Sequence, residues 1–163
     1  MIELNLKRNN SNELLTFGTL FCPKLGIQCA TMEIKVPRKN EVLKHCCCID
    51  DGSYQMKMGM VEGHPFMPVL RHKPKGFAVR PRLTLKDLDY VHLLTGNIAL
   101  GTEIASATSL KTTEQFKEFF IRQFTDLFTW RPKEIVVLNV YYSATYIHEP
   151  INPLRRMELA DEE

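Results

Sequence analysis

The chain has 163 residues, 44% of them hydrophobic, which is enough for one domain with a substantial core and too little for two. Its 21 basic and 19 acidic residues leave a net charge of +2, so nothing draws it generally to nucleic acid or to an anionic membrane. No apolar run approaches the roughly 18 residues that span a bilayer, and no signal-peptide pattern opens the chain, so we expect synthesis and retention in a cytoplasm and no membrane partner.

The first part of the chain predicts an antiparallel meander. Three segments rich in Thr, Val, Ile, Phe and Cys are separated by turn compositions, and they are Leu14–Phe21, Gln28–Val36 and Val42–Ile49. After a turn at Asp50–Gly52, the segment Ser53–Met60 alternates polar and apolar residues. This alternation predicts a further strand.

A helix is predicted after Thr112. The stretch Thr112–Gln115 supplies an N-cap threonine with a glutamine three residues later, which is a capping box. Large apolar residues then recur at helical spacing, and they are Phe116, Phe119, Phe120, Phe124, Leu127 and Phe128. This stripe predicts a helix laid across the sheet, ending before Pro132.

The segment Glu134–Tyr142 is apolar on both faces, which predicts a central strand covered on both sides. Beyond it, Pro150 and Pro153 interrupt the pattern. The expected fold class is α+β, a mostly antiparallel β-sheet with one long C-terminal amphipathic helix packed on it. Residues 1–143 would form a single globular domain, and residues 144–163 a C-terminal extended arm that needs a partner surface or stays mobile.

Two short motifs lie between Lys75 and Gly101. The first reads Gly-Phe-Ala-Val-Arg-Pro-Arg over residues 76–82, and the second reads Gly-Asn-Ile-Ala-Leu-Gly over residues 96–101. They resemble the phage- and prophage-borne family catalogued as domain of unknown function 5675, whose pattern is Gly-Ile-Arg-Ile-His-Pro/Ala-Gly-Asn and then Gly-Cys-Ile-Leu-x-Gly. Arg80 stands at the histidine position of that pattern and Asn97 at the cysteine position.

The resemblance runs from about Leu14 to Val140. Gly52 and Tyr54 match a Pro-x-Gly-x-Tyr-x-Val anchor of the family, and Pro65–Leu70 echoes its short Leu-Pro-like strand. The family's His and Gly-Cys signature is loosely similar to that of L,D-transpeptidases, which act on peptidoglycan peptides. The resemblance therefore implies a fold once suited to a site for such peptides.

The two departures remove the chemistry of that site. Arginine stays protonated and cannot act as a base, and an asparagine amide is not a nucleophile in ordinary hydrolysis. A cysteine-histidine pair works because imidazole takes the thiol proton. We therefore expect no catalytic residue at Arg80 or Asn97, and no cofactor.

A cluster of cations is the first candidate binding feature. It comprises Arg71, Lys73, Lys75, Arg80 and Arg82, and such a cluster can bind anionic groups of a partner or be a solvated loop. The histidines His64, His72 and His92 surround the presumed cleft, although loop histidines more often simply face solvent. Both readings remain open from the sequence.

The five cysteines include the adjacent trio Cys46–Cys48. Adjacent strand residues point to opposite faces, so only Cys46 and Cys48 could converge, with Cys22 and Cys29 as the nearest helpers. Zinc sites usually space their ligands further apart, so we predict buried, reduced thiols and no metal.

Three functions remain in contention. The leading hypothesis is a non-catalytic binding or structural module of a phage or mobile element, such as a virion or assembly component that contacts other protein subunits through its C-terminal arm. The alternative is a cysteine enzyme acting on peptidoglycan peptides, with Cys46 or Cys48 as a relocated nucleophile and His92 or His64 as its base. A nucleic-acid-binding protein is third, because binding would have to depend on the basic cluster alone.

Overall fold

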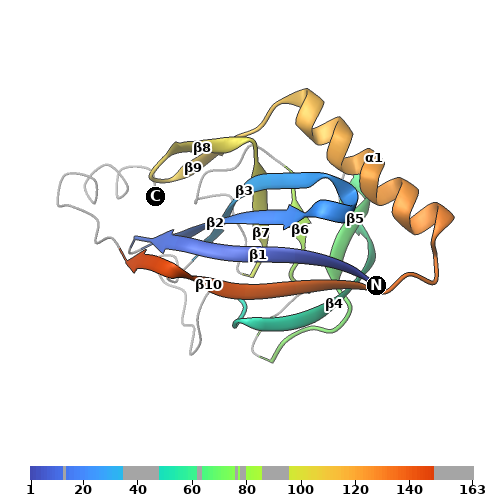
Figure 1. Ribbon diagram of the computed structural model, residues 1–163, viewed down its shortest axis with the longest axis horizontal. Coiled ribbons are helices and arrows are strands. Elements are labelled where there is room, and N and C mark those ends of the chain that lie inside the picture. Colours follow the sequence, from blue (N-terminus) through green and yellow to red (C-terminus); the bar gives the residue numbers. More distant parts are fainter. Residues whose placement is uncertain are drawn as a thin grey trace.

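The computed structural model describes residues 1–12, 14–34, 48–61, 64–75, 77, 80–85 and 96–148, without the side chains of residues 60–67. Over these ranges the chain forms ten strands, one short 3-10 helix and one α-helix (Figure 1). The elements are β1 (Ile2–Ser11), β2 (Leu15–Cys22), η1 (Pro23–Leu25), β3 (Ile27–Ile34), β4 (Gly52–Val61), β5 (His64–Leu70), β6 (Leu83–Thr84), β7 (Ile98–Gly101), β8 (Glu103–Ser106), β9 (Ser109–Lys111), α1 (Glu114–Trp130) and β10 (Val136–His148).

Eight of these strands form one curved sheet in the order β5-β4-β10-β1-β2-β3-β7-β6. The two edges approach each other, because Leu70 N donates to Pro81 O at 2.9 Å and Val69 bridges Arg82. The sheet is therefore nearly closed into a barrel. The predicted α+β class is confirmed, but the sheet is mixed, since β1 pairs with β10 and β6 with β7 in parallel.

β1 shows how the sequence selects the inside of the barrel. Ile2, Leu4 and Leu6 are buried, while Glu3 is exposed, which is the period-two pattern of a strand with one face in the core. β1 lies between β10 and β2 in the middle of the sheet. This strand was not predicted from the sequence.

The apolar core has two parts. The larger part lines the inside of the curved sheet and includes Leu4, Leu20, Leu100 and Leu138. A second cluster contains Leu15, Phe17, Met32, Ile34, Ala99 and Leu110, the last of these from β9 of the β8-β9 hairpin. Both sides of β2 are therefore largely buried, as the strand's burial pattern shows.

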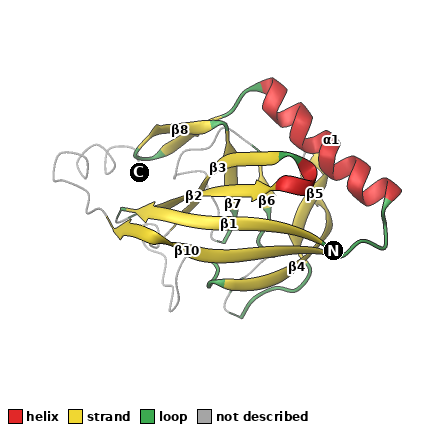
Figure 2. Ribbon diagram, in the orientation of Figure 1, coloured by secondary structure: helices red, strands yellow, loops and turns green. Residues whose placement is uncertain are grey.

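The helix α1 is the long red element in Figure 2 and lies across the side of the molecule where β1 and β10 begin; the short red segment is η1. Phe120, Phe124 and Leu127 are buried in the larger core cluster, and Phe116 and Phe128 pack against it. The predicted apolar stripe is therefore the packing face of α1 except at Phe119, which is 39% exposed. The predicted capping box is wrong by one residue. The N-cap is Thr113, whose Oγ1 accepts from Phe116 N at 3.1 Å, so Gln115 does not occupy the position that would complete the box.

β10 is central, as predicted, since β1 and β4 flank its first half. It is not covered on both faces: Val136, Leu138 and Val140 are buried, but the residues between them are partly exposed. β10 also continues to His148, where Ser11 of β1 pairs with it. Residues 144–148 of the predicted arm thus belong to the sheet, and 149–163 lie outside the described residues, as does most of the predicted strand Val42–Ile49.

We expect Phe124→Ala to lower the free energy of unfolding by about 3–5 kcal/mol, because it removes a fully buried ring and leaves a cavity. The matched control is Phe119→Ala on the same helix, where the side chain is 39% exposed. Urea unfolding monitored by circular dichroism measures both. Equal losses for the two variants would show that the helix does not pack as described.

Candidate functional site

The segment Arg71–Arg82 joins β5 to β6 and carries the basic cluster. Its first end is attached to the sheet by Arg71 N, which donates to Gln55 O at 2.8 Å. Its other end is attached through Pro81 O, and a turn forms between them where Phe77 N donates to Pro74 O at 3.2 Å. The backbone at both ends is therefore fixed by the barrel.

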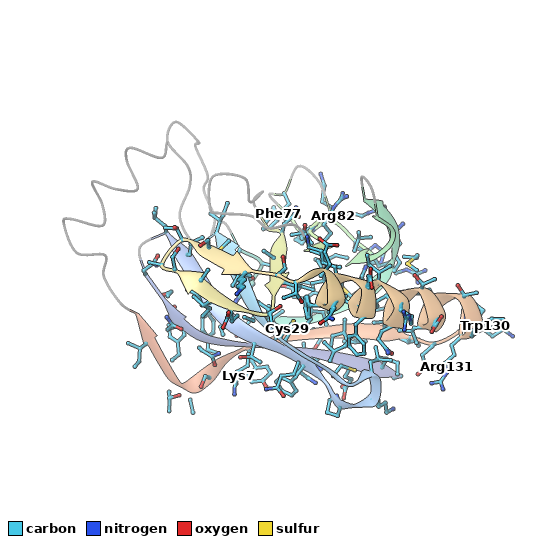
Figure 3. All side chains as sticks on the ribbon, turned by 90° about the horizontal axis from the view of Figure 1, so that it is seen from above. Lys7, Cys29, Phe77, Arg82, Trp130 and Arg131 are labelled. Atoms are coloured by element: carbon cyan, nitrogen blue, oxygen red, sulfur yellow. The ribbon has the colours of Figure 1, made fainter. Side chains whose placement is uncertain are left out.

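The cations of this segment face outward. The side chains of Arg71, Lys73, Lys75 and Arg80 are exposed, whereas Arg82 is half-buried. Residues 71–82 contain five Lys or Arg and no Asp or Glu, so the weak net charge of the whole chain hides a strong local one. Figure 3 shows Phe77 and Arg82 next to each other on this side of the molecule.

The structure brings the segment that contains Arg80 alongside Asn97. Arg82 N donates to Asn97 Oδ1 at 3.3 Å, and Ile98 N donates to Arg82 O at 2.9 Å. Asn97 is only 6% exposed, while Arg80 lies at the surface. The Asn97 carboxamide thus holds the turn before β7 in place.

Gly96 explains how closely these two segments approach. Its φ is +82°, and a Cβ there would lie 2.6 Å from Cε1 of Phe77 and 3.0 Å from Cγ of Pro81. Only glycine combines this backbone conformation with the space that the ring occupies. Phe77, Pro81 and Gly96 therefore pack as one wall beneath the basic cluster.

The predicted histidines are not gathered here by any described contact. His72 is exposed in the basic segment, and His64 begins β5. The side chain of His64 and the whole of His92 lie outside the described residues. A histidine cleft stays a prediction.

The described cysteines are all buried, and they are Cys22, Cys29 and Cys48. Burial raises the pKa of Cys29 from 9.0 to about 12, against a smaller opposing effect of a backbone hydrogen bond. Among the described residues, no three His, Cys, Asp or Glu side chains form a group that could hold a metal ion. Cys46 and Cys47 lie outside the described residues.

The most unusual polar feature was missed from the sequence. Arg8 on β1 and Glu33 on β3 are 0% and 1% exposed and form a bidentate ion pair inside the barrel. Arg8 Nε donates to Glu33 Oε2 at 3.0 Å, and Arg8 Nη2 donates to Glu33 Oε1 at 2.8 Å. Arg8 Nη2 also donates to Ile49 O at 2.6 Å. The sequence does indicate that Arg8 points inward, because Arg8 follows Ile2, Leu4 and Leu6 at the two-residue spacing of one strand face.

The surroundings keep Arg8 charged. Burial by itself lowers the pKa of Arg8, but the charge of Glu33 and its hydrogen bonds outweigh burial, so the pKa of Arg8 is raised. Arg8 Nη1 also donates to Tyr142 Oη at 3.4 Å, and the guanidinium lies 5.2 Å from the centre of that ring. An arginine held in this way cannot release a proton, so the pair is structural.

Gly18 makes the crossing from β1 to β3 possible. On β2 it pairs with Arg8 of β1 on one side and with Thr31 of β3 on the other. The Arg8 side chain must pass over this position of β2 to reach Glu33 on β3. A Cβ on Gly18 would lie 2.5 Å from Lys7 O and 2.9 Å from Thr31 Oγ1. No side chain other than hydrogen has room there, so the ion pair can form over β2.

A shallow groove of about 490 Å³ lies outside the barrel, over β1, β2 and β3. Lys7, Thr19, Phe21 and Gln28 contribute to its walls. The groove offers one cation and one aromatic ring without a nucleophile beside a base, so it has no evident catalytic chemistry.

Family models, curated proteins and solved structures were all compared with this chain, and none matches it. Within the described part of the chain, no helix is both long and apolar enough to cross a membrane. The site must therefore be interpreted from its own geometry.

Replacing Arg8 with Met should destabilise the protein by about 3–5 kcal/mol, because Glu33 would remain buried without its partner. The double variant Arg8→Met/Glu33→Met should recover much of this loss, since no isolated charge is left inside. Chemical unfolding of the wild type, the two single variants Arg8→Met and Glu33→Met, and the double variant gives the coupling energy. Lys7→Met, on the opposite face of β1, is the control and should change stability little.

Proposed function

We propose that this protein is a non-catalytic binding module, and that the basic segment Arg71–Arg82 is the surface that holds an acidic partner protein. The observation that carries the proposal is the segment itself: its cations are unopposed by any acid in residues 71–82, and the sheet fixes both of its ends. A fixed backbone lowers the conformational entropy that a binding surface loses when a partner is captured.

The neighbouring residues support binding without covalent chemistry. Asn97 uses its carboxamide oxygen to accept from a backbone amide. The N–H protons of a carboxamide are too weakly acidic for a protein base to remove, so this side chain is not activated as a nucleophile. The described thiols are buried in the protein. An exposed arginine at position 80 can contribute charge and hydrogen bonds to a carboxylate, which is what a binding surface requires.

The resemblance to domain of unknown function 5675 supports the setting of the proposal. In that setting the chain is made in the cytoplasm of a bacterial host and serves a phage or mobile element as a virion or assembly component. The inferred history is a mostly antiparallel sheet with its helix, once suited to a peptidoglycan-peptide site and now used for its surface. Partner subunits provide the acidic chemistry that the basic segment recognises.

The binding surface is tested with poly-L-glutamate as a defined acidic probe. We expect the variant Arg71→Gln/Lys73→Gln/Lys75→Gln/Arg80→Gln to lose about tenfold or more in affinity, since exposed ion pairs contribute about 0.2–1 kcal/mol each. The matched control removes four exposed cations elsewhere, with Lys111→Gln/Arg122→Gln/Arg131→Gln/Lys133→Gln. Biolayer interferometry at low and moderate salt measures both.

Equal losses in the two variants would mean that net charge alone drives binding, and the proposal would fail. A single-stranded or duplex DNA probe tests the nucleic-acid rival in the same assay. DNA binding that is stronger than polyglutamate binding and disappears with the loop variant would favour that rival.

The cysteine-enzyme alternative predicts a fast thiolate near neutral pH, whereas the binding module predicts inert buried thiols. We expect Cys22, Cys29 and Cys48 to stay unmodified by maleimide in the native protein at neutral pH. The raised pKa of Cys29 adds stability that is fully present below about pH 9 and lost as pH rises toward about 12. Mass spectrometry of tryptic peptides locates any modified thiol, and rapid labelling of Cys46 or Cys48 would revive the enzyme hypothesis.

A further inference from the structure

The basic segment has a charge-complementary counterpart in the same chain. Residues 157–163 read Met-Glu-Leu-Ala-Asp-Glu-Glu and contain four acids and no base. They also carry two apolar side chains, Met157 and Leu159. The four exposed cations of residues 71–82 are thus matched in number by the four negative charges of residues 157–163.

We propose that residues 157–163 of one copy of this chain dock on the basic segment Arg71–Arg82 of a second copy. The inference rests on the function proposed above and names the acidic partner as the protein itself. The exposed cations Arg71, Lys73, Lys75 and Arg80 would pair with carboxylates of the incoming segment. Phe77 and Pro74 are only partly exposed and supply an apolar surface for Met157 and Leu159.

Distance along β10 favours a second copy over the same molecule. Arg71 N bonds to Gln55 O, and Gln55 pairs with Val137, so the basic segment starts level with the beginning of β10. Val137 pairs with Glu3 and His148 pairs with Ser11, so these two positions of β10 are eight residues apart along β1, which at about 3.3 Å per residue is about 26 Å. The three extra residues of β10 lie in the irregular stretch between Tyr142 and Ile147.

For docking within one molecule, the residues after His148 would have to run back along β10 over that distance. From His148 to Glu158 there are ten peptide steps, which can span at most about 35 Å when fully extended. The path must also cross β4, at about 5 Å per strand. Docking within one molecule thus needs most of the length of the connection to Glu158 and leaves it little conformational freedom, whereas a second molecule can be placed freely.

Such a contact is heterologous, because a tail of one copy meets a loop of the next. Contacts of this kind continue into a ring or an open chain of subunits, as an assembly component requires. The surface is small and its charges are exposed, so each contact should be weak and strongly weakened by salt.

The test is analytical ultracentrifugation of the full chain over a range of concentrations, at low and moderate salt. A loop-reversed variant carries Arg71→Glu/Lys73→Glu/Lys75→Glu/Arg80→Glu, and a tail-reversed variant carries Glu158→Lys/Asp161→Lys/Glu162→Lys/Glu163→Lys. The wild type should associate as concentration rises at low salt, and each variant alone should associate at least tenfold more weakly. Circular dichroism confirms that the variants keep the wild-type fold.

Mixing the two variants gives the decisive result. The loop-reversed chain keeps an acidic tail and the tail-reversed chain keeps a basic loop, and the reversed loop and the reversed tail also complement each other. The mixture should therefore form assemblies that contain both variants in equal numbers and that neither variant forms alone. A chain that combines both reversals should associate again like the wild type. A wild type that stays monomeric at every concentration, or a mixture that forms no complex, would overturn the proposal.

The polyglutamate assay separates the two levels of the argument. If wild-type protein binds polyglutamate through the loop but the tail-reversed variant self-associates normally, the binding module stands and the tail is not its ligand. If polyglutamate binding is also insensitive to the loop, the proposed function fails with the inference.

Discussion

The buried ion pair between Arg8 and Glu33 is the constraint on which the barrel depends. It joins β1 to β3 over β2, and both partners are removed from water. A charge left unpaired in such a place costs several kcal/mol, so only a strand arrangement that brings the two together is stable. A shift of the pairing register of β1 or β3 by one residue would turn one partner of the ion pair outward and leave the other buried without a counter-charge. The pair therefore fixes the register of the central strands.

The two ends of the barrel interior are filled by different kinds of side chain. Where β1 and β10 begin, α1 covers the interior with Phe120 and Phe124, which join Ile2 and Leu4 in one apolar cluster. Further along β1 the interior becomes polar at Arg8 and Glu33. Ile49 O and Tyr142 Oη complete the bonding of the guanidinium at that level, so the burial of Arg8 is tolerated because its donors find partners. Apolar packing and a satisfied charge pair thus stabilise different parts of the same sheet.

The sequence predicted what is local and missed what depends on distant partners. The helix was predicted because its apolar stripe repeats over several turns, and β2, β3 and β4 because their residues alternate between turn signals. The predicted and observed N-caps differ by one residue because Thr112 and Thr113 are equally good N-cap residues, and the local sequence does not distinguish them. The alternation of β1 was present in Ile2, Leu4 and Leu6, but an inward Arg8 is understandable only with Glu33, 25 residues away. The near closure of the barrel rests on contacts of Val69 and Leu70 with residues 81 and 82, which no local pattern announces.

The candidate site follows from this rigid frame. β5 and β6 are the two edges of the sheet, and the segment between them is held by main-chain bonds at Arg71 and Pro81. A segment bonded to the sheet at both ends can carry several like charges without unfolding the protein, because solvent screens the repulsion between exposed side chains. The side chains beneath it, Phe77 and Asn97, are used to pack and to bond the turn at Gly96. The exposed side chains of Arg71, Lys73, Lys75 and Arg80 are positively charged, and for that reason we propose that this edge of the barrel recognises an acidic surface.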